Sequence, residues 1–171
     1  MPMPRKLKNM NLFVDAESYL GVATEVTPPK LERKLEAYRG GGMGGSAKAD
    51  FGWAEDALKL EWKCGGYVKQ VVQQMGAATV DGVQLRFAQA YQRDDTGEVE
   101  SVEIVVRGRH GVLDRGTAKV GDDTEWTVTT ECVYYKETVN GEVVAEIDIF
   151  NLVDTIGGVD GSEAIRRAIG M

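Results

Sequence analysis

The sequence has little of the chemistry that catalytic and metal sites need. It contains one histidine and two cysteines in 171 residues. The histidine, His110, lies in the run RGRHG with no matching serine or cysteine nucleophile and no second metal ligand. Cys64 and Cys132 form no CxxC pair and have no histidine at metal-binding spacing. We therefore expect no enzyme activity, no cofactor, no metal site, a structural or turn-exposed histidine, and reduced cysteines half-buried in strands.

Long hydrophobic runs are also missing. None approaches the roughly 18 apolar residues of a membrane-spanning helix. The basic N-terminus is not followed by the apolar segment of a secretory signal. We therefore expect neither a membrane anchor nor a signal peptide. The 43% of hydrophobic residues is enough for one globular domain with a real core, or one domain with long arms.

Most of the chain alternates between apolar and polar residues with period two, which is the pattern of β-strands. Several of these stretches run nine to twelve residues, against about five or six in a typical strand, which favours a barrel or tube wall. An Asn140-Gly141 pair predicts a tight hairpin turn. The predicted strands cover residues 11–15, 30–38, 56–64, 83–87, 98–109, 126–137 and 143–149, and the predicted helices cover residues 67–75 and 162–169.

A glycine-rich segment, RGGGMGGSAK over residues 39–48, lies between two of the predicted strands. Gly40, Gly42 and Gly45 formally match the dinucleotide-binding pattern GxGxxG. That motif must follow a buried parallel strand and open a helix, whereas here it lies between two charged, alternating strands. We therefore predict a long flexible hairpin or an assembly loop over residues 39–50.

Charge is distributed unevenly along the chain. Residues 1–93 carry 13 basic and 10 acidic side chains, a balance of +3, and residues 94–163 carry 5 basic and 17 acidic ones, a balance of −12. The last eight residues add +2, which gives the total of −7. This split predicts one acidic surface and one mildly basic surface. A solvated acidic face without a role is the alternative.

Several short runs resemble one known family when they are taken in order. They are residues 10–15 (MNLFVD), 27–31 (TPPKL), 36–43 (EAYRGGGM), 133–136 (VYYK) with Gly141, 146–148 (EID) with Asn151, and 156–160 (IGGVD) before a terminal helix. Their order and spacing resemble the major tail tube proteins of contractile phages and R-type pyocins. The resemblance spans nearly the whole chain, although residues 89–123 add nothing diagnostic.

The resemblance implies a mainly β fold: an antiparallel β-sandwich or partial barrel with one flanking helix and a short C-terminal helix. It implies that six copies form a ring in which the inner strands make one continuous barrel. Stacked rings would build the tail tube of the virion, assembled in the host bacterial cytoplasm with a sheath, a tape-measure protein, a baseplate and a tail terminator. DNA would pass through the lumen. A monomeric carbohydrate-binding or adhesin-like β-sandwich is the alternative.

We expect a single domain over residues 1–171. Within it, two segments are predicted to make the contacts between subunits or rings. One is an N-terminal arm over residues 1–14, basic with an apolar end, and the other is the glycine-rich loop. Residues 162–171 form the C-terminal helix. The predicted contact residues are Arg5, Lys6, Lys8, Leu12, Phe13, Arg39, Gly40, Gly41, Gly42, Met43, Gly44 and Gly45.

The polar faces of the long strands are the predicted lining of the lumen. Carboxylates there would repel the DNA backbone, so that the genome slides rather than sticks. We expect carboxylates to outnumber amines on this wall. The predicted lumen residues are Glu32, Lys34, Glu36, Lys59, Glu61, Lys63 and Glu103.

Overall fold

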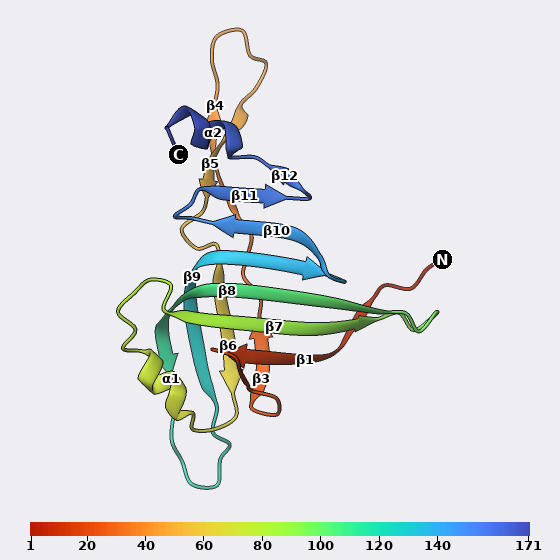
Figure 1. Cartoon of the computed structure of the whole chain (residues 1–171), viewed down its shortest axis with the longest axis vertical. Helices are drawn as coiled ribbons and strands as arrows, with labels where there is room; N and C mark the ends of the chain where they lie inside the picture. Colours follow the sequence, from red (N-terminus) through yellow and green to blue (C-terminus); the bar gives the residue numbers. More distant parts are fainter.

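The computed structural model describes all residues, 1–171, and consists of twelve strands and two short helices (Figure 1). The predicted mainly antiparallel β fold with two helices is confirmed. The elements are β1 Lys6–Val14, β2 Glu17–Ser18, β3 Ala23–Thr27, β4 Arg33–Tyr38, β5 Ala47–Trp53, β6 Lys59–Cys64, α1 Lys69–Gln74, β7 Val83–Gln92, β8 Val99–Asp114, β9 Trp126–Val139, β10 Glu142–Asp148, β11 Val153–Ile156, β12 Val159–Asp160 and α2 Glu163–Ala168.

One long sheet forms the frame of the molecule. Its strand order is β12-β11-β10-β9-β8-β7-β1-β2, with neighbouring strands antiparallel, and β6 and β3 branch from β9. The branch exists because β9 changes partner along its length: its first half pairs with β6 and its second half with β10. Register shifts in the β8–β9 pairing, beside Gly108 and between His110 and Val112, allow the ribbon to bend. The long strands therefore belong to two layers.

A core of twenty buried apolar residues fills the space between the two layers. Leu60, Trp62 and Cys64 enter it from β6, because every second residue of a strand points to the same face. Other strands supply Leu12, Val14, Val83, Leu85, Phe87, Ile104, Val106, Val128 and Ile147 in the same way. Both cysteines are free and buried, and burial raises the pKa of the Cys132 thiol to about 12.

His110 is a buried structural residue that ties α1 to the sheet. Its Nδ1 lies 2.8 Å from the Thr130 hydroxyl and its Nε2 lies 2.9 Å from Gln74 Oε1. The Gln74 amide nitrogen donates to Asp15 Oδ2 at 2.7 Å, so the Gln74 oxygen accepts from the histidine Nε2–H. Burial lowers the pKa of His110 to about 4. The structural alternative for this residue is thus confirmed and the turn-exposed one is wrong.

The N-terminal segment differs from its prediction. Residues 6–14 form β1, which pairs with β7 along its whole length, so the expected arm over residues 1–14 is reduced to residues 1–5. Leu12 is 1% exposed and packs in the core of its own subunit. It is therefore wrong as the apolar anchor of an arm, because its side chain is already enclosed.

The local predictions from the sequence had mixed outcomes. The Asn140-Gly141 turn is confirmed, with φ of +48° and +84° at its two central residues. The strands β2, β3, β5, β11 and β12 were not predicted, because they are short or expose both faces. Ser162 precedes α2 as expected, but its side chain makes no capping hydrogen bond and is buried.

Candidate assembly surfaces

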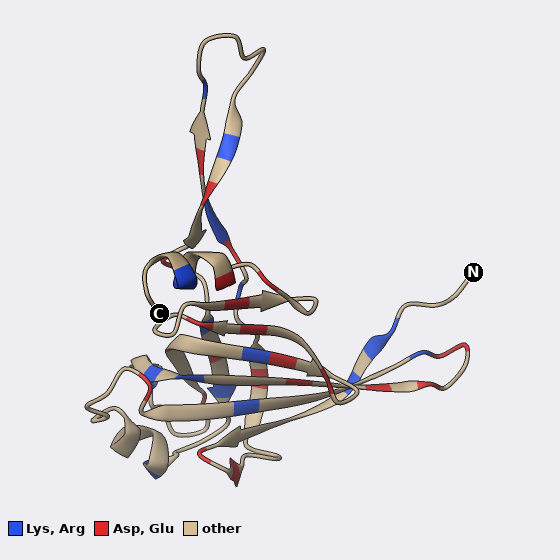
Figure 2. Cartoon of the chain, turned by 45° about the horizontal axis from the view of Figure 1, so that its top comes forward, with Lys and Arg blue, Asp and Glu red and all other residues tan.

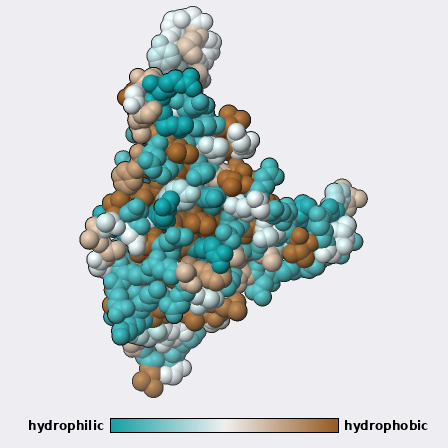
Figure 3. Space-filling model, viewed as in Figure 1, coloured by the Kyte–Doolittle hydropathy of each residue, from teal (hydrophilic) through white to brown (hydrophobic).

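The β4–β5 hairpin projects from the body of the molecule (Figure 1). It forms a two-stranded sheet of its own. Leu35, Tyr38 and Phe51 are 49%, 66% and 64% exposed along it. The glycine-rich loop forms its tip, which is pale in Figure 3 and thus neither strongly hydrophilic nor hydrophobic. The loop is shorter than predicted, since residues 47–50 belong to β5. Contacts of Arg39 to Gly45 with a neighbouring subunit remain a prediction.

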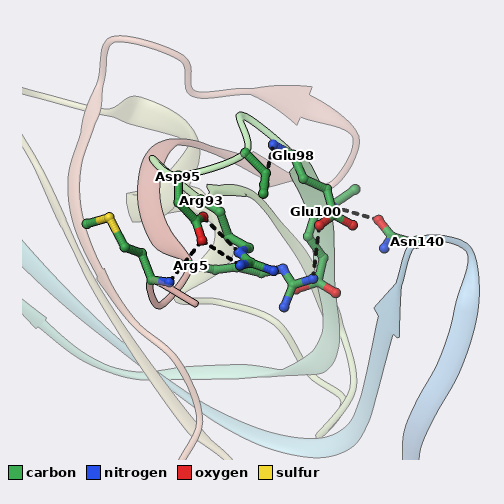
Figure 4. Close-up of polar contacts among 9 residues, drawn as sticks. Arg5, Arg93, Asp95, Glu98, Glu100 and Asn140 are labelled. Carbon is green, nitrogen blue, oxygen red and sulfur yellow. Dashed lines mark hydrogen bonds and ion pairs between the residues drawn. The ribbon is translucent and has the colours of Figure 1, made fainter. Parts of the chain in front are cut away.

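The basic N-terminus lies along the acidic turn between β7 and β8 (Figure 4). The Met3 backbone N–H donates to Asp95 Oδ2 at 3.1 Å, and Lys8 Nζ lies 2.6 Å from Asp94. Arg5 lies 3.5 Å from Glu98 and 3.3 Å from Glu100. The guanidinium of Arg93 and the Met3 N–H lower the pKa of Asp95 to about 2. Basic residues that were predicted to contact another subunit thus form ion pairs with acidic residues of their own subunit.

Many of the ion pairs within one subunit join the basic and the acidic halves of the sequence. Figure 2 shows basic and acidic positions interspersed over the strands rather than gathered on two sides. The two charged halves of the sequence therefore do not become two separate surfaces. Eight of the fourteen ion pairs join a base from residues 1–93 to an acid from residues 94–163.

The predicted lumen residues lie on three different surfaces. Glu32, Lys34 and Glu36 lie at the base and along the exposed hairpin. Lys59, Glu61 and Lys63 alternate with the buried residues of β6 and point away from the core. Glu103 points outward from β8, in the other layer. One subunit does not bring these seven side chains together, because alternation defines a face of each strand but not which layer that strand joins.

The outward face of β7, β8 and β9 carries a row of stacked and paired side chains. Arg86 lies 4.0 Å from the centre of the Phe13 ring and 3.3 Å from Glu103. Arg107 lies 3.9 Å from the centre of the Tyr134 ring. Adjacent residues of a strand point to opposite faces, so Tyr135 is buried and Tyr134 points outward. Tyr134 donates to Glu146 at 3.1 Å.

Sequence reasoning missed Arg86 and Arg107 as members of this face. The signal was available, because both residues alternate with buried neighbours along β7 and β8. Phe13, one of the predicted contact residues, lies under Arg86 on the surface of the sheet. Its contact with another subunit stays a prediction.

The long sheet has unpaired strand edges at both ends. The outer edge of β1 pairs with β2 through Phe13 and Val14 alone, so residues 6–11 have no strand partner on that side. At the other end, β11 pairs with β10 from Ala145 onward, which leaves Glu142 and Val143 uncovered. Exposed strand edges are templates for pairing with another chain.

Two further features of the structure bear on its chemistry. No group of three or more histidine, cysteine, aspartate or glutamate residues is placed to hold a metal ion. Neither helix has the length and apolar character needed to cross a membrane.

The family model for phage tail tube protein FII matches residues 4–170. The chain belongs to this family. It is 51% identical over 172 residues to the tail tube protein of Escherichia phage P2, with all of both chains covered. It is 37% identical to the major tail tube protein of Serratia phage KSP20 over 153 residues, covering 90% of this chain and 88% of that protein. A chain in the cryo-EM structure of the anti-feeding prophage baseplate superimposes with a TM-score of 0.47 at 8% identity, covering 75% of this chain and 90% of that one.

Membership of the family confirms the resemblance that the short sequence runs indicated. The comparisons favour a phage tail tube protein and not the carbohydrate-binding or adhesin-like alternative. The exposed features of the fold, its projecting hairpin and its open strand edges, are therefore the surfaces to consider for assembly.

Proposed function

We propose that the protein is a non-catalytic structural protein of a contractile phage tail, in which its copies build the inner tube through which the genome leaves the virion. The observation that carries this proposal is the identity of 51% with the phage P2 tail tube protein along the entire chain. Because this identity extends over the full length of both proteins, we expect the phage P2 protein to have the same exposed strand edges and the same hairpin.

Six copies would close a ring by pairing the edge of β1 in one subunit with the edge of β10 in the next. The strands β1, β8 and β10 run in the same direction, because each neighbouring pair between them is antiparallel. The junction would therefore be parallel. Lys6 and Glu142 are exposed on the two edges, and they make none of the ion pairs within the subunit. Closing the ring would remove both edges and join the sheets into one barrel.

The uncovered face of the long sheet would line the lumen. Its other face is covered by the layer that contains β3, β6 and α1. Because a ring has less room inside than outside, this bulkier side would face outward. In this proposed arrangement, Glu103 would lie on the wall with Arg86 and Tyr134. Because Arg86 is held by Phe13 and Glu103, it would be less free to extend toward a passing phosphate backbone. Lys59, Glu61 and Lys63 would then face the outside of the tube.

Stacking of rings would use the parts that project from the body. The loop of Arg39 to Gly45 and the N-terminal residues around Arg5 would reach the next ring. Such head-to-tail contacts join two different surfaces and propagate without limit. The sheath would surround the tube, the tape-measure protein would occupy it during assembly in the host bacterial cytoplasm, and the baseplate and tail terminator would cap its ends.

The ring contact is tested by exchanging charges between the two edges. We expect Lys6→Glu and Glu142→Lys each to reduce ring formation, because each places like charges across the junction. The double variant should restore it, because the pair is reversed but intact. Sedimentation velocity measures the fraction of rings and filaments, and negative-stain microscopy shows their form.

The matched control is Lys119→Glu, an exposed base in the β8–β9 loop. It should assemble like the unmodified protein, and circular dichroism should show the same fold for all variants. Unmodified protein that stays monomeric at high concentration would contradict the proposed function. Two single variants that weaken assembly without rescue in the double variant would contradict the edge pairing alone.

A further inference from the structure

The base of the projecting hairpin is joined to the body by one cluster of side chains. Arg33, the first residue of β4, pairs across the hairpin with Trp53, the last residue of β5. A register shift follows between Arg33 and Leu35. Gly52 permits it with φ of +98°, and its N–H donates to Asp50 Oδ1 at 2.8 Å. The local sequence therefore builds a bend where the hairpin leaves the body.

Arg33 crosses this bend and binds the edge of the long sheet. Its Nη1 and Nη2 lie 2.5 Å and 3.0 Å from the two carboxylate oxygens of Asp154 on β11. The guanidinium lies 4.0 Å from the centre of the Trp53 ring and 3.6 Å from Asp50. The Arg33 side chain is 33% exposed and that of Asp154 is 14% exposed. A two-point ion pair of this kind restricts direction as well as distance.

Little else holds the hairpin in one orientation. The β4–β5 sheet pairs with no other strand, and an isolated two-stranded hairpin is marginal in water. A cavity of about 240 Å³, lined by residues that include Trp53, Ile149 and Leu152, lies at the junction instead of close apolar packing. The buried Trp53 indole N–H has no hydrogen-bond acceptor. Backbone bonds from Ala54 to Glu32 and from Leu58 to Lys30 anchor the chain below the bend.

We propose that Arg33 is the positioning residue of the hairpin: by clamping Asp154 and stacking on Trp53, it fixes the direction in which the hairpin leaves the body, and this direction is needed for docking on the next ring. The second half of the inference rests on the proposed function. The first half concerns the isolated subunit. The clamp joins residues 121 positions apart in the chain.

The direction of the hairpin is measured in the monomer by double electron–electron resonance spectroscopy, which gives the distribution of distances between two spin labels. Spin labels on Ser46→Cys, at the end of the loop, and Ser101→Cys, on exposed β8, report the distance between hairpin and body. Cys64 and Cys132 are buried, so they react poorly with the label. We expect one narrow distance distribution for the unmodified clamp and broad distributions for Arg33→Met and Asp154→Asn. Arg33→Lys should be intermediate, because lysine keeps the charge but loses the two-point geometry.

The same variants are then tested for tube formation. Arg33→Met should raise the protein concentration needed for tubes about tenfold, since the loss of a charge-assisted contact of this kind is of that order. Lys30→Met is the matched control, because it breaks the exposed Lys30–Glu32 pair beside the same bend. It should leave both the distance distribution and assembly unchanged.

Each result bears on a separate part of the inference. A narrow distribution in Arg33→Met would overturn the clamp, because the backbone alone would then hold the hairpin. A broad distribution with normal tube formation would overturn the need for a fixed direction. Unmodified protein that forms no tubes would count against the proposed function, whereas the monomer measurement would still decide the clamp.

Discussion

The body and the β4–β5 hairpin use the same secondary structure for different purposes. In the body, the central strands pair on both sides and bury one face, so Trp62, Phe87 and Val106 are 0–1% exposed. In the hairpin, two strands pair with each other alone, and Tyr38 and Phe51 are 66% and 64% exposed. Stability therefore resides in the body, while the hairpin presents apolar side chains that its own subunit does not cover.

The difference also separates two kinds of polar contact. Within the body, His110 and Thr130 are buried and satisfied by hydrogen bonds, which makes them costly to disturb. Around the N-terminus, pairs such as Arg5–Glu98 are exposed, and such pairs contribute about 0–1 kcal/mol each. Changes in the body should therefore affect the free energy of unfolding, and changes in the hairpin should affect assembly.

Truncation of aromatic residues should give the largest contrast. Trp62→Ala removes a fully buried ring that packs edge-on against Tyr19, and we expect it to lower the free energy of unfolding by about 3–5 kcal/mol. Phe51→Ala in the hairpin should change it by less than about 0.5 kcal/mol. Urea denaturation followed by fluorescence and circular dichroism measures both. Similar losses for the two variants would mean that the hairpin is part of the cooperative body.

Glycine substitution should give the next largest contrast. A Cβ at Gly108 would lie 2.0 Å from the Glu131 carbonyl oxygen, so Gly108→Ala must displace backbone and should cost about 3 kcal/mol. Gly44→Ala meets no atom within 4 Å and should leave stability unchanged. The thermal midpoint of each variant provides the measurement. An unchanged midpoint for Gly108→Ala would refute the close approach of β8 and β9 at the bulge.

Mild acid should weaken the body through His110. Its pKa is about 4 in the folded protein against 6.5 when unperturbed, so the unfolded chain binds the proton first and stability falls as the pH drops through this window. Between about pH 7.5 and about pH 5.5 the loss should be about 1 kcal/mol. Urea titrations at the two pH values test this. His110→Gln, which cannot titrate, should show a smaller loss, and an equal loss would assign the effect to other groups.

Deletion of Gly41 to Gly45 should have the smallest effect on folding. The loop buries no core residue, so the shortened protein should keep its circular dichroism spectrum and its unfolding midpoint. We expect it to fail in polymerisation, because the tip of the hairpin would no longer reach its partner. Negative-stain microscopy distinguishes the outcomes. Normal tubes from the deleted protein would show that the loop is a spacer.

The sequence by itself determined which faces of the strands are buried. Alternation placed Leu60, Trp62 and Cys64 on the inner face of β6, and an Asn-Gly pair located the β9–β10 turn, because these patterns depend on neighbours in the chain. The runs that resemble tail tube proteins were equally local and identified the family. The fold class and the family of the chain were thus readable without a structure.

Only the tertiary structure decided which strands are neighbours. Alternation cannot tell that β9 pairs with β6 and then with β10, or that residues 6–14 complete the long sheet through Leu12. The same holds for Arg33 with Asp154 and for Arg5 with Glu100, because charge pairing depends on register and distance between segments far apart in the sequence. Local patterns set the faces of strands, and long-range packing set the partners, the exposed edges and the direction of the hairpin.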